Sequence, residues 1–393
     1  KLIREKALPG QLPEFSADVE NRADPFPLND IQQAYWVGRS GNYELGGVST
    51  HAYFEVDCTD LNMQRFSRAL NRLIRRHDML RAIVNNDGYQ QILGQVREYH
   101  IEIDDFRRLS EDQTSHRLSS IRQQMSHQVL PSNQWPLFEV RATQIDQRRI
   151  RLHFSFDGLI MDAWSRNIFF KELIAFYRQP KLSFAPYEIS FRDYVLALES
   201  LKDSAPYRRS MHYWRERFVS LPFPPELPVI KNRCARTQNR FQRLTSEMSH
   251  EDWRRLKTRA RKAGLTPSAL LLAAFSEVIS AWSKTPRFLL NVPHFNRLPI
   301  HPQVNGLIGQ FASLTFLECS NAKVETFEEN AQQIQKQLWA DLEHGITGGV
   351  ALLRELSKYW NQVGQSVLPV VFTSAPQGLE KKNTSPLKAL GDV

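Results

Sequence analysis

The order in which strand-like and helix-like segments follow one another most constrains the fold of this chain. Segments that alternate apolar and polar residues, as strands do, are interleaved with segments whose apolar residues recur at helical spacing. The first such pair is 50–58, rich in strand formers, and 60–77, which we expect Asp60 to cap. The predicted strands are 50–58, 80–84, 137–145, 149–156, 240–246, 288–292, 313–318 and 367–373. The predicted helices are 60–77, 111–129, 163–177, 191–201, 206–218, one that starts after Ser249, 267–282 and 327–342.

Both halves of the chain show this interleaving, which is typical of α/β proteins. Residues 179–186 contain two prolines and 221–228 contain four, so neither stretch can be a helix interior or a central strand. We therefore predict two α/β units that meet near residues 180–205. The predicted helix 267–282 is apolar almost all round, which favours a buried position.

Composition narrows the class of protein. The chain has 393 residues, of which 41% are hydrophobic and 11% aromatic, and this excludes disorder as the main state. The longest apolar run, 269–275, is far shorter than the roughly 20 residues of a membrane helix. Three cysteines lie far apart, which favours a reducing cytoplasm over a disulfide framework or a structural zinc site.

The charge balance is basic, with 51 Lys and Arg against 42 Asp and Glu. The excess is compatible with binding to nucleic acid or to an acidic partner, and equally with the solvated faces of amphipathic helices. Because no recognisable nucleic-acid module accompanies the basic clusters, we favour solvated helix faces. The clusters are Arg72, Arg75, Arg76, Arg81 and Arg254, Arg255, Lys257, Arg259, Arg261, Lys262.

The segment 153–165 contains the strongest candidate site. A predicted strand ends there, and a short loop brings Asp157, Asp162 and Ser165 to the start of a predicted helix. Asp162 stands where an N-cap residue belongs, and Asp157 lies at a strand exit, where loop residues often carry function. We expect His153, on the strand, to be a core histidine. The sequence motifs of dinucleotide, nucleoside triphosphate, zinc-protease and esterase sites are absent.

The spacing Asp157-x4-Asp162-x2-Ser165 resembles the signature of the heterocyclization domains of nonribosomal peptide synthetases, which are relatives of condensation domains. Other segments resemble further motifs of that family in the same order, over roughly residues 25–378. They are 26–39, 76–82, 212–217, 290–299 and 370–374.

The resemblance implies an α/β fold with two lobes similar to chloramphenicol acetyltransferase, set in a V with a tunnel between them. We place a linker at 1–24, an N-terminal lobe at 25–186 and a C-terminal lobe at 187–393, which we expect to lack its last strands. The resemblance implies a cytoplasmic domain with no cofactor or metal of its own and no nucleic-acid or membrane partner. Upstream and downstream carrier proteins would supply phosphopantetheine arms, and an adenylation domain would be adjacent.

The resemblance also suggests roles for individual residues. Asp157 takes the place of the first histidine of the condensation signature, Gly158 that of the histidine credited with catalysis, and Asp162 that of its aspartate. Ring formation is assigned to Thr373, with a partner aspartate expected beyond Val393. Asp157, Asp162 and Ser165 are expected to support the active site structurally, although Ser165 could also line the tunnel. The residues expected to shape the tunnel are Gly158, Asn296, Gln310 and Ser374.

The implied reaction condenses an upstream acyl thioester with a cysteinyl, seryl or threonyl thioester, then cyclises and dehydrates the product to a thiazoline or oxazoline. Gln310 and Ala312 stand where the family usually has an acid and a hydroxyl. These departures leave open a degenerate domain that only condenses or only binds. A basic interaction module for nucleic acid or acidic partners is the alternative from a different class.

Overall fold

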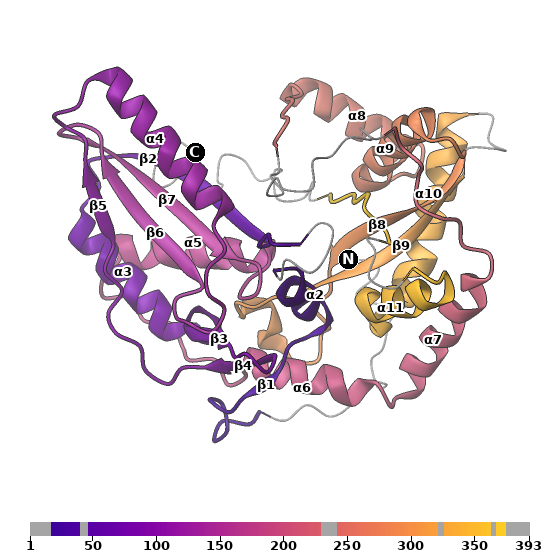
Figure 1. Cartoon of the computed structure of the whole chain (residues 1–393), viewed down its shortest axis with the longest axis horizontal. Helices are drawn as coiled ribbons and strands as arrows, with labels where there is room; N and C mark the ends of the chain where they lie inside the picture. Colours follow the sequence, from indigo (N-terminus) through magenta and orange to yellow (C-terminus); the bar gives the residue numbers. More distant parts are fainter. Residues whose placement is uncertain (1–16, 40–45, 229–241, 321–325, 363–366, 375–393) are drawn as a thin grey trace.

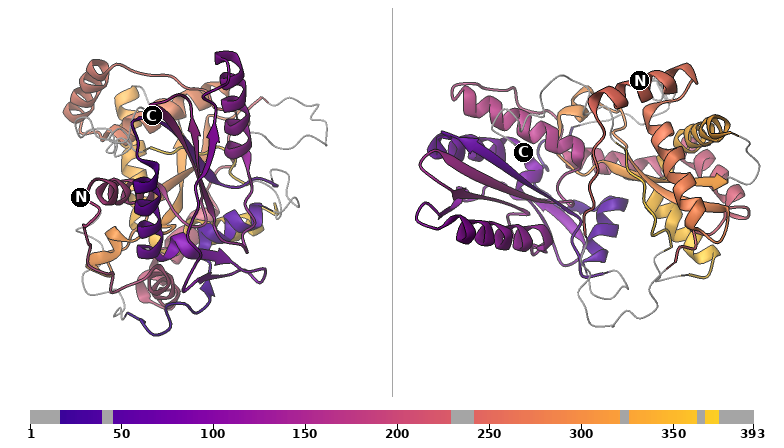
Figure 2. Two further views of the ribbon diagram at one scale, coloured as in Figure 1. Left: turned by 90° about the vertical axis from the view of Figure 1, so that its left-hand side faces the viewer. Right: turned by 90° about the horizontal axis from the view of Figure 1, so that it is seen from above.

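The computed structural model of the chain describes residues 17–39, 46–228, 242–320, 326–362 and 367–374. The helices and strands form two lobes, which lie side by side in Figure 1 and in the right-hand view of Figure 2. The strands are β1 Phe26–Pro27, β2 His51–Thr59, β3 Ala82–Val84, β4 Tyr89–Ile92, β5 Glu102–Asp105, β6 Phe138–Gln144, β7 Arg149–Asp157, β8 Arg287–Phe295 and β9 Ala312–Ser320. The α-helices are α2 Asp30–Gly38, α3 Met63–Arg76, α4 Glu111–His127, α5 Ala163–Arg178, α6 Phe191–Leu201, α7 Ala205–Phe218, α8 His250–Lys262, α9 Pro267–Trp282, α10 Phe327–Glu343 and α11 Gly349–Tyr359. Short 3-10 helices span Asp78–Arg81, Pro302–Gly306 and Gly345–Thr347.

The first lobe is built on a four-stranded sheet in the order β2-β7-β6-β5. The β5–β6 pair is parallel and the other pairs are antiparallel. β7 pairs with β2 from His51 opposite Asp157 to Thr59 opposite Arg149. Helices α3 and α5 pack on one face of the sheet and α4 on the other (Figure 1). Because both faces are covered, β7 is buried along most of its length, and its last residue reaches the lobe boundary at a fixed position.

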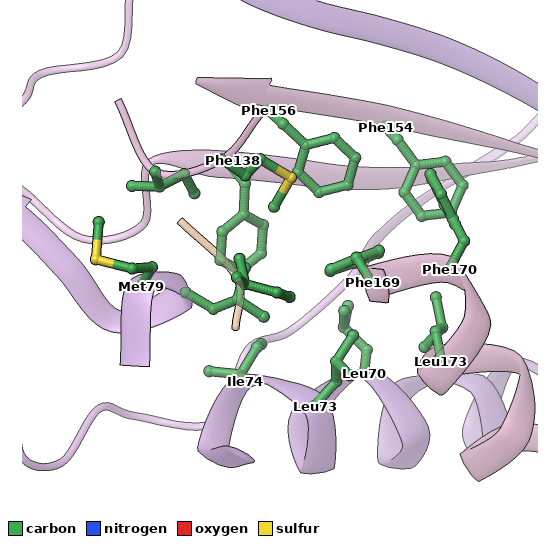
Figure 3. Close-up of a cluster of buried hydrophobic side chains, with 14 of the residues drawn as sticks. Leu70, Leu73, Ile74, Met79, Phe138, Phe154, Phe156, Phe169, Phe170 and Leu173 are labelled. Carbon is green, nitrogen blue, oxygen red and sulfur yellow. The ribbon is translucent and has the colours of Figure 1, made fainter. Parts of the chain in front are cut away.

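Aromatic side chains fill the space between this sheet and the two helices α3 and α5 (Figure 3). Phe156 of β7 meets Phe169 of α5 edge to face, with ring centroids 4.8 Å apart. Phe154 meets Phe170 in the same way at 5.1 Å. Such pairs are favourable beyond the apolar area they bury, so the core fixes α5, and the loop before it, against the sheet.

The second lobe is built on the antiparallel pair β8–β9, from Arg287 opposite Ser320 to Phe295 opposite Ala312. Apolar residues of α9 and α10 pack on one side of this pair, and those of α7 and α11 on the other. The stretch 304–311, which leads into β9, contributes four apolar residues to the core of the first lobe. The chain therefore crosses back into the first lobe before β9 begins.

Most of the predicted helices and strands are confirmed, but three predictions are wrong. The strand at 240–246 is absent over its described residues 242–246, which are irregular. Only Val371 of the predicted strand 367–373 forms a bridge, with Asn291 of β8. Asp60 does not cap α3, because its φ is 55° and it lies before the helix. Asn62 is the cap instead, and its side chain accepts a hydrogen bond from the Arg65 amide at 2.9 Å.

The expectation that the helix at 267–282 is buried all round is also wrong. Leu272 and Ala273 are buried against β8 and β9, whereas Val278 is 58% exposed and Trp282 66% exposed. A helix packed on one side of a two-stranded sheet buries only the stripe that faces the sheet, whatever the composition of its other face.

Across the described residues, no single helix has the length and hydropathy needed to cross a bilayer. Only α8 and α9 together pass that test, and they are bent by 98° at the break between them.

A capping contact joins the lobes at the start of α11. The N-cap residue of α11 is Gly348, which has no side chain and a φ of 71°. The carboxylate of Asp30, from α2, occupies the space that a side chain on Gly348 would need and accepts a hydrogen bond from the Ala351 amide. Burial raises the pKa of Asp30. Asp30 thus caps, from the first-lobe side, a helix of the second lobe whose own cap residue cannot do so.

Replacing Asp30 should therefore weaken the packing of α11. We expect Asp30→Ala to lower the free energy of unfolding in urea by about 1 kcal/mol, the usual loss for an N-cap. Asp30→Asn retains a capping oxygen and should lose less. Ser249→Ala removes the local cap of α8 and is the matched control, with a similar loss. An Asp30→Ala protein as stable as the parent would contradict the capping role.

Candidate active site

The loop between β7 and α5 holds Asp157 in a closed set of contacts. Asp157 is 3% exposed. Its Oδ1 accepts a hydrogen bond from the Leu159 amide at 2.9 Å, and its Oδ2 accepts one from Ser49 Oγ at 3.0 Å and forms an ion pair with Arg39. Arg39 also donates to the Leu130 carbonyl at 2.9 Å. Burial lowers the pKa of Arg39 to about 10, which still leaves the guanidinium charged at neutral pH. The carboxylate is therefore engaged in fixing the loop.

Asp162 and Ser165 connect the start of α5 to the second lobe. Asp162 is the N-cap of α5, and its Oδ1 accepts from the Ser165 amide at 2.7 Å and from Arg297 Nη2 at 3.2 Å. Ser165 Oγ donates to the Gly309 carbonyl at 2.7 Å and accepts from the Gly309 amide at 3.0 Å and from Arg297 Nη2 at 2.8 Å. Both side chains are buried. The structure thus assigns Ser165 to packing between segments, one of the two roles considered for it.

Arg297 is the centre of this contact. It follows β8, and its Nη1 donates to the carbonyls of Val304 and Leu307 at 2.8 and 2.9 Å. Its guanidinium lies 3.8 Å from the ring centroid of Phe311. A buried guanidinium requires this combination of carboxylate, carbonyl and aromatic partners, because leaving it unpaired away from water is costly.

Gly158 occupies the position where a condensation signature has its catalytic histidine, and the loop leaves no space there for a side chain. A Cβ at residue 158 would lie 2.6 Å from the Thr50 carbonyl oxygen and 3.3 Å from Tyr35 Cδ2. The Gly158 amide donates to that same Thr50 carbonyl at 2.6 Å. An imidazole at this position would require the backbone at Thr50, just before β2, to move.

Gln310, in the stretch that leads into β9, holds this loop from the other side. Its Nε2 donates to the Gly158 carbonyl at 2.7 Å, its Oε1 accepts from the Ala312 amide at 3.0 Å, and its own carbonyl accepts from Asn29 Nδ2 at 2.7 Å. A carboxylate at position 310 would have no donor for the Gly158 carbonyl. Gln310 therefore donates a hydrogen bond to the Gly158 carbonyl that the acid usual at this position in the family could not donate.

The remaining predicted residues lie outside this network. The Asn296 amide donates to the Phe311 carbonyl at 3.1 Å, and its carbonyl accepts from Tyr194 Oη at 2.7 Å. Asn296 also lines a cavity of about 70 Å³ between the lobes.

Thr373 is exposed and follows the residues that pair with β8. Ser374 Oγ lies 3.2 Å from Ser268 Oγ at the start of α9. The structure brings Asp157, Gly158, Asp162, Ser165 and Gln310 together, while Thr373 and Ser374 lie beside α9.

His153, Cys58 and Cys319 are core residues, and Cys234 lies outside the described residues. His153 Nδ1 lies 2.8 Å from Tyr53 Oη, and Nε2 lies 3.0 Å from Thr143 Oγ1. Burial lowers the pKa of His153 to about 4, so the ring is neutral at pH 7. Burial raises the pKa of the Cys58 and Cys319 thiols to about 12, which makes them unreactive. Within the described ranges, no group of three or more His, Cys, Asp or Glu residues could hold a metal ion.

Sequence reasoning did not identify Arg39 or Arg297 as site residues. Both lie in segments that resemble family motifs, 26–39 and 290–299, and each is the arginine that such a segment contains at or near its end. Two aspartates that support a site structurally need cationic or hydrogen-bonding partners. The arginines in the neighbouring family motifs were therefore candidates for those partners.

The close approach of Thr50 to Gly158 can be tested by adding one methyl group. We expect Gly158→Ala to lower the free energy of unfolding by about 2 kcal/mol, in the range of overpacking, because its Cβ must displace the backbone of Thr50. Gly38→Ala is the matched control, since nothing lies within 4 Å of its added Cβ. Gly38→Ala should be neutral or slightly stabilising. Equal stability of both variants in urea unfolding would show that the loop has room for a side chain.

Comparison with known proteins identifies relatives along the whole described chain. A family model described as "Condensation domain" matches residues 22–391. Bacitracin synthase 1 of Bacillus licheniformis is 34% identical over 91% of this chain and 7% of its own length. Phenyloxazoline synthase MbtB of Mycolicibacterium paratuberculosis is 36% identical over 92% of this chain and 31% of its own length. The chain therefore spans less than a third of these curated relatives.

Solved structures show the same relation in three dimensions. The EpoB NRPS cyclization-docking bidomain of Sorangium cellulosum superposes with a TM-score of 0.88 and is 40% identical, covering 97% of this chain and 76% of that one. The nonribosomal peptide synthetase FmoA3 gives a TM-score of 0.85 at 31% identity, covering 98% of this chain and 38% of that one.

Proposed function

Because this chain belongs to the condensation-domain family, among the cyclization domains of nonribosomal peptide synthetases, we propose that it condenses two carrier-bound acyl groups and closes the product to a thiazoline or oxazoline. The observation that carries this proposal is the loop 157–162. Its two aspartates are engaged in fixing the loop, and Gly158 leaves no space for a catalytic imidazole. The 36% identity to a protein named phenyloxazoline synthase supports the same reaction class.

The first step needs little from the side chains at this loop. The amine of a cysteinyl, seryl or threonyl thioester adds to the carbonyl of the upstream thioester. The tetrahedral adduct then expels the upstream thiolate, which takes up the proton lost by the amine, and an amide remains. An unprotonated amine held next to a thioester is already reactive, so holding the two groups together supplies most of the rate. A rigid loop between two lobes suits that task.

Ring closure needs more help from catalytic groups than amide formation does. The side-chain thiol or hydroxyl adds to the new amide carbonyl, and the cyclic adduct loses its hydroxyl group and the proton on nitrogen as water, leaving a C=N bond. Hydroxide is a poor leaving group, so a proton must be delivered to it. We assign this role to Thr373, whose hydroxyl lies on an exposed segment beside β8, acting with the carboxylate that the family resemblance implies.

The substrates would arrive on partner proteins. Upstream and downstream carrier proteins would bring the two thioesters on phosphopantetheine arms into the space between the lobes, and an adenylation domain would load the downstream carrier. The great length of the curated relatives, of which this chain covers 7% and 31%, supports such a multidomain setting.

Reconstitution with loaded carrier proteins tests the proposal. The complete protein is mixed with both carriers, and the product is weighed by mass spectrometry. A product lighter by one water than the linear amide supports cyclization. A linear amide as the only product would contradict ring closure and favour a domain that only condenses, and no new amide would favour one that only binds.

Thr373 gives a sharper prediction. We expect Thr373→Ala to slow ring closure by about 100-fold, the lower end for loss of a proton donor, so that the linear amide accumulates. Amide formation should stay within about twofold, because it does not need this proton. Thr373→Ser should restore ring closure, and Thr258→Ala, on the exposed face of α8, is the matched control. Ring closure at the parent rate in Thr373→Ala would show that another group delivers the proton.

A further inference from the structure

We infer that a groove on the outer side of the first lobe is a docking surface for an acidic segment of another polypeptide. The groove has a volume of about 580 Å³ and lies between the end of α3 and the stretch 183–187. It is lined by five arginines and one acid, Arg22, Arg72, Arg75, Arg76, Arg81 and Asp78. We call these residues the arginine groove. The inference does not depend on the cyclization chemistry.

Hydrogen bonds to carbonyl groups of the segment 180–187 hold three arginines of the groove in place. Arg72 donates to the carbonyls of Pro180 and Leu182. Arg76 Nη1 donates to the Ala185 carbonyl at 2.7 Å, and Arg22 Nη1 donates to the Tyr187 carbonyl at 3.1 Å. The expectation that this cluster is a solvated helix face is therefore wrong for Arg72 and Arg76, whose side chains hold an irregular segment that lacks strand partners.

These contacts fix the guanidinium groups without neutralising them. Carbonyl oxygens carry no net charge. Among the residues that the structure describes, two carboxylates pair with the groove: Asp78 with Arg22 at 2.6 Å and Arg81 at 2.9 Å, and Glu172 with Arg76 at 2.8 Å. The groove has five guanidinium groups and these pair with two carboxylates, so three positive charges remain without a balancing negative charge. A preorganised cationic groove binds anions at low entropic cost, because its side chains are already ordered.

Arg75 is the one arginine of the groove that is available in full. It is exposed, and within the described part of the chain it forms no hydrogen bond or ion pair. Arg72, Arg75 and Arg76 stand three and four residues apart on α3, so their side chains project from one face of the helix. Guanidinium groups arranged in this way suit successive carboxylates, each of which can accept two parallel hydrogen bonds.

The aromatic rings of the groove argue against nucleic acid as the occupant. Arg72 covers the ring of Phe176 at 4.3 Å, and Arg76 covers Phe184 at 5.0 Å and Tyr187 at 4.5 Å. Single-stranded nucleic acid binds by stacking its bases on free ring faces, and these faces are already occupied. The volume also exceeds what one phosphate needs. A run of Asp and Glu on a partner protein matches both the charge and the extent of the groove.

Charge reversal at Arg75 tests this inference. The probe is a fluorescently labelled oligoglutamate peptide, and its binding to the complete protein is followed by anisotropy at low and high salt. We expect the parent to bind the peptide in a salt-sensitive manner and Arg75→Glu to bind about tenfold more weakly. Arg254→Glu, on exposed α8, changes the net charge equally and should bind within about twofold of the parent.

Each other outcome would overturn the inference. If the parent does not bind the peptide, the groove is not a docking surface. An equal loss in Arg75→Glu and Arg254→Glu would show that the peptide responds only to the net charge of the protein. Tighter binding of a mixed-sequence oligonucleotide than of the peptide, lost in Arg75→Glu, would make the groove a nucleic-acid site, and the same result with inorganic phosphate would make it a small-anion site. Thermal unfolding checks that Arg75→Glu is folded, and Arg75→Ala, with an expected loss of about threefold, replaces it if it is not.

Discussion

The buried contact of Arg297 with Asp162 and Ser165 is the interaction on which the arrangement of the lobes depends. It joins the start of α5, in the first lobe, to the chain that follows β8, in the second. Removing one member of a buried ion pair costs about 3–5 kcal/mol, because the other charge stays behind without a partner. The contact is supplemented by hydrogen bonds from Nη1 to two carbonyls and by the ring of Phe311. The lobes are thereby held together at the point where the loop 157–162 must be placed.

The same loop leaves no space for an imidazole base at position 158. Gly158 is held between Thr50, which precedes β2, and Gln310, which precedes β9, with hydrogen bonds of 2.6 and 2.7 Å at its amide and carbonyl. The two aspartates on either side of it hold arginines from different parts of the chain. What remains is a loop whose two aspartates are engaged in holding it in place, which favours catalysis by positioning here. The proton donor for ring closure must then come from another part of the domain.

Local sequence patterns predicted the helices and strands well where periodicity and caps agree. The strand that ends at Asp157 and the helix that Asp162 caps both occur as expected. The predicted strands 240–246 and 367–373 failed because strand propensity is realised only where a partner strand is available. The exposed face of α9 was missed because composition does not say how many sides of a helix are covered.

The candidate site was predictable only in part, because local sequence patterns do not reveal distant partners. The spacing of Asp157, Asp162 and Ser165 placed them in one loop, but their partners Arg39 and Arg297 lie more than a hundred residues away along the chain. No periodicity encodes such contacts. The cap that Asp30 provides to α11 is equally invisible, because the helix and its cap belong to different lobes.

The excess of positive charge has a structural cause that composition could not reveal. Irregular segments leave carbonyl oxygens without strand or helix partners, and buried carbonyls must find donors. Arginine, with five N–H groups in a fixed plane, can reach several of them at once. Arg39 donates a hydrogen bond to the Leu130 carbonyl, and Arg297 donates to those of Val304 and Leu307. Arg72 donates to two carbonyls beside α3. A carbonyl satisfies the hydrogen bond but leaves the charge. Arg39 and Arg297 also pair with Asp157 and Asp162, whereas the charge of Arg72 adds to the field around it. Where such arginines gather, as they do beside the end of α3, the fold creates an electropositive surface as a consequence of holding its own chain.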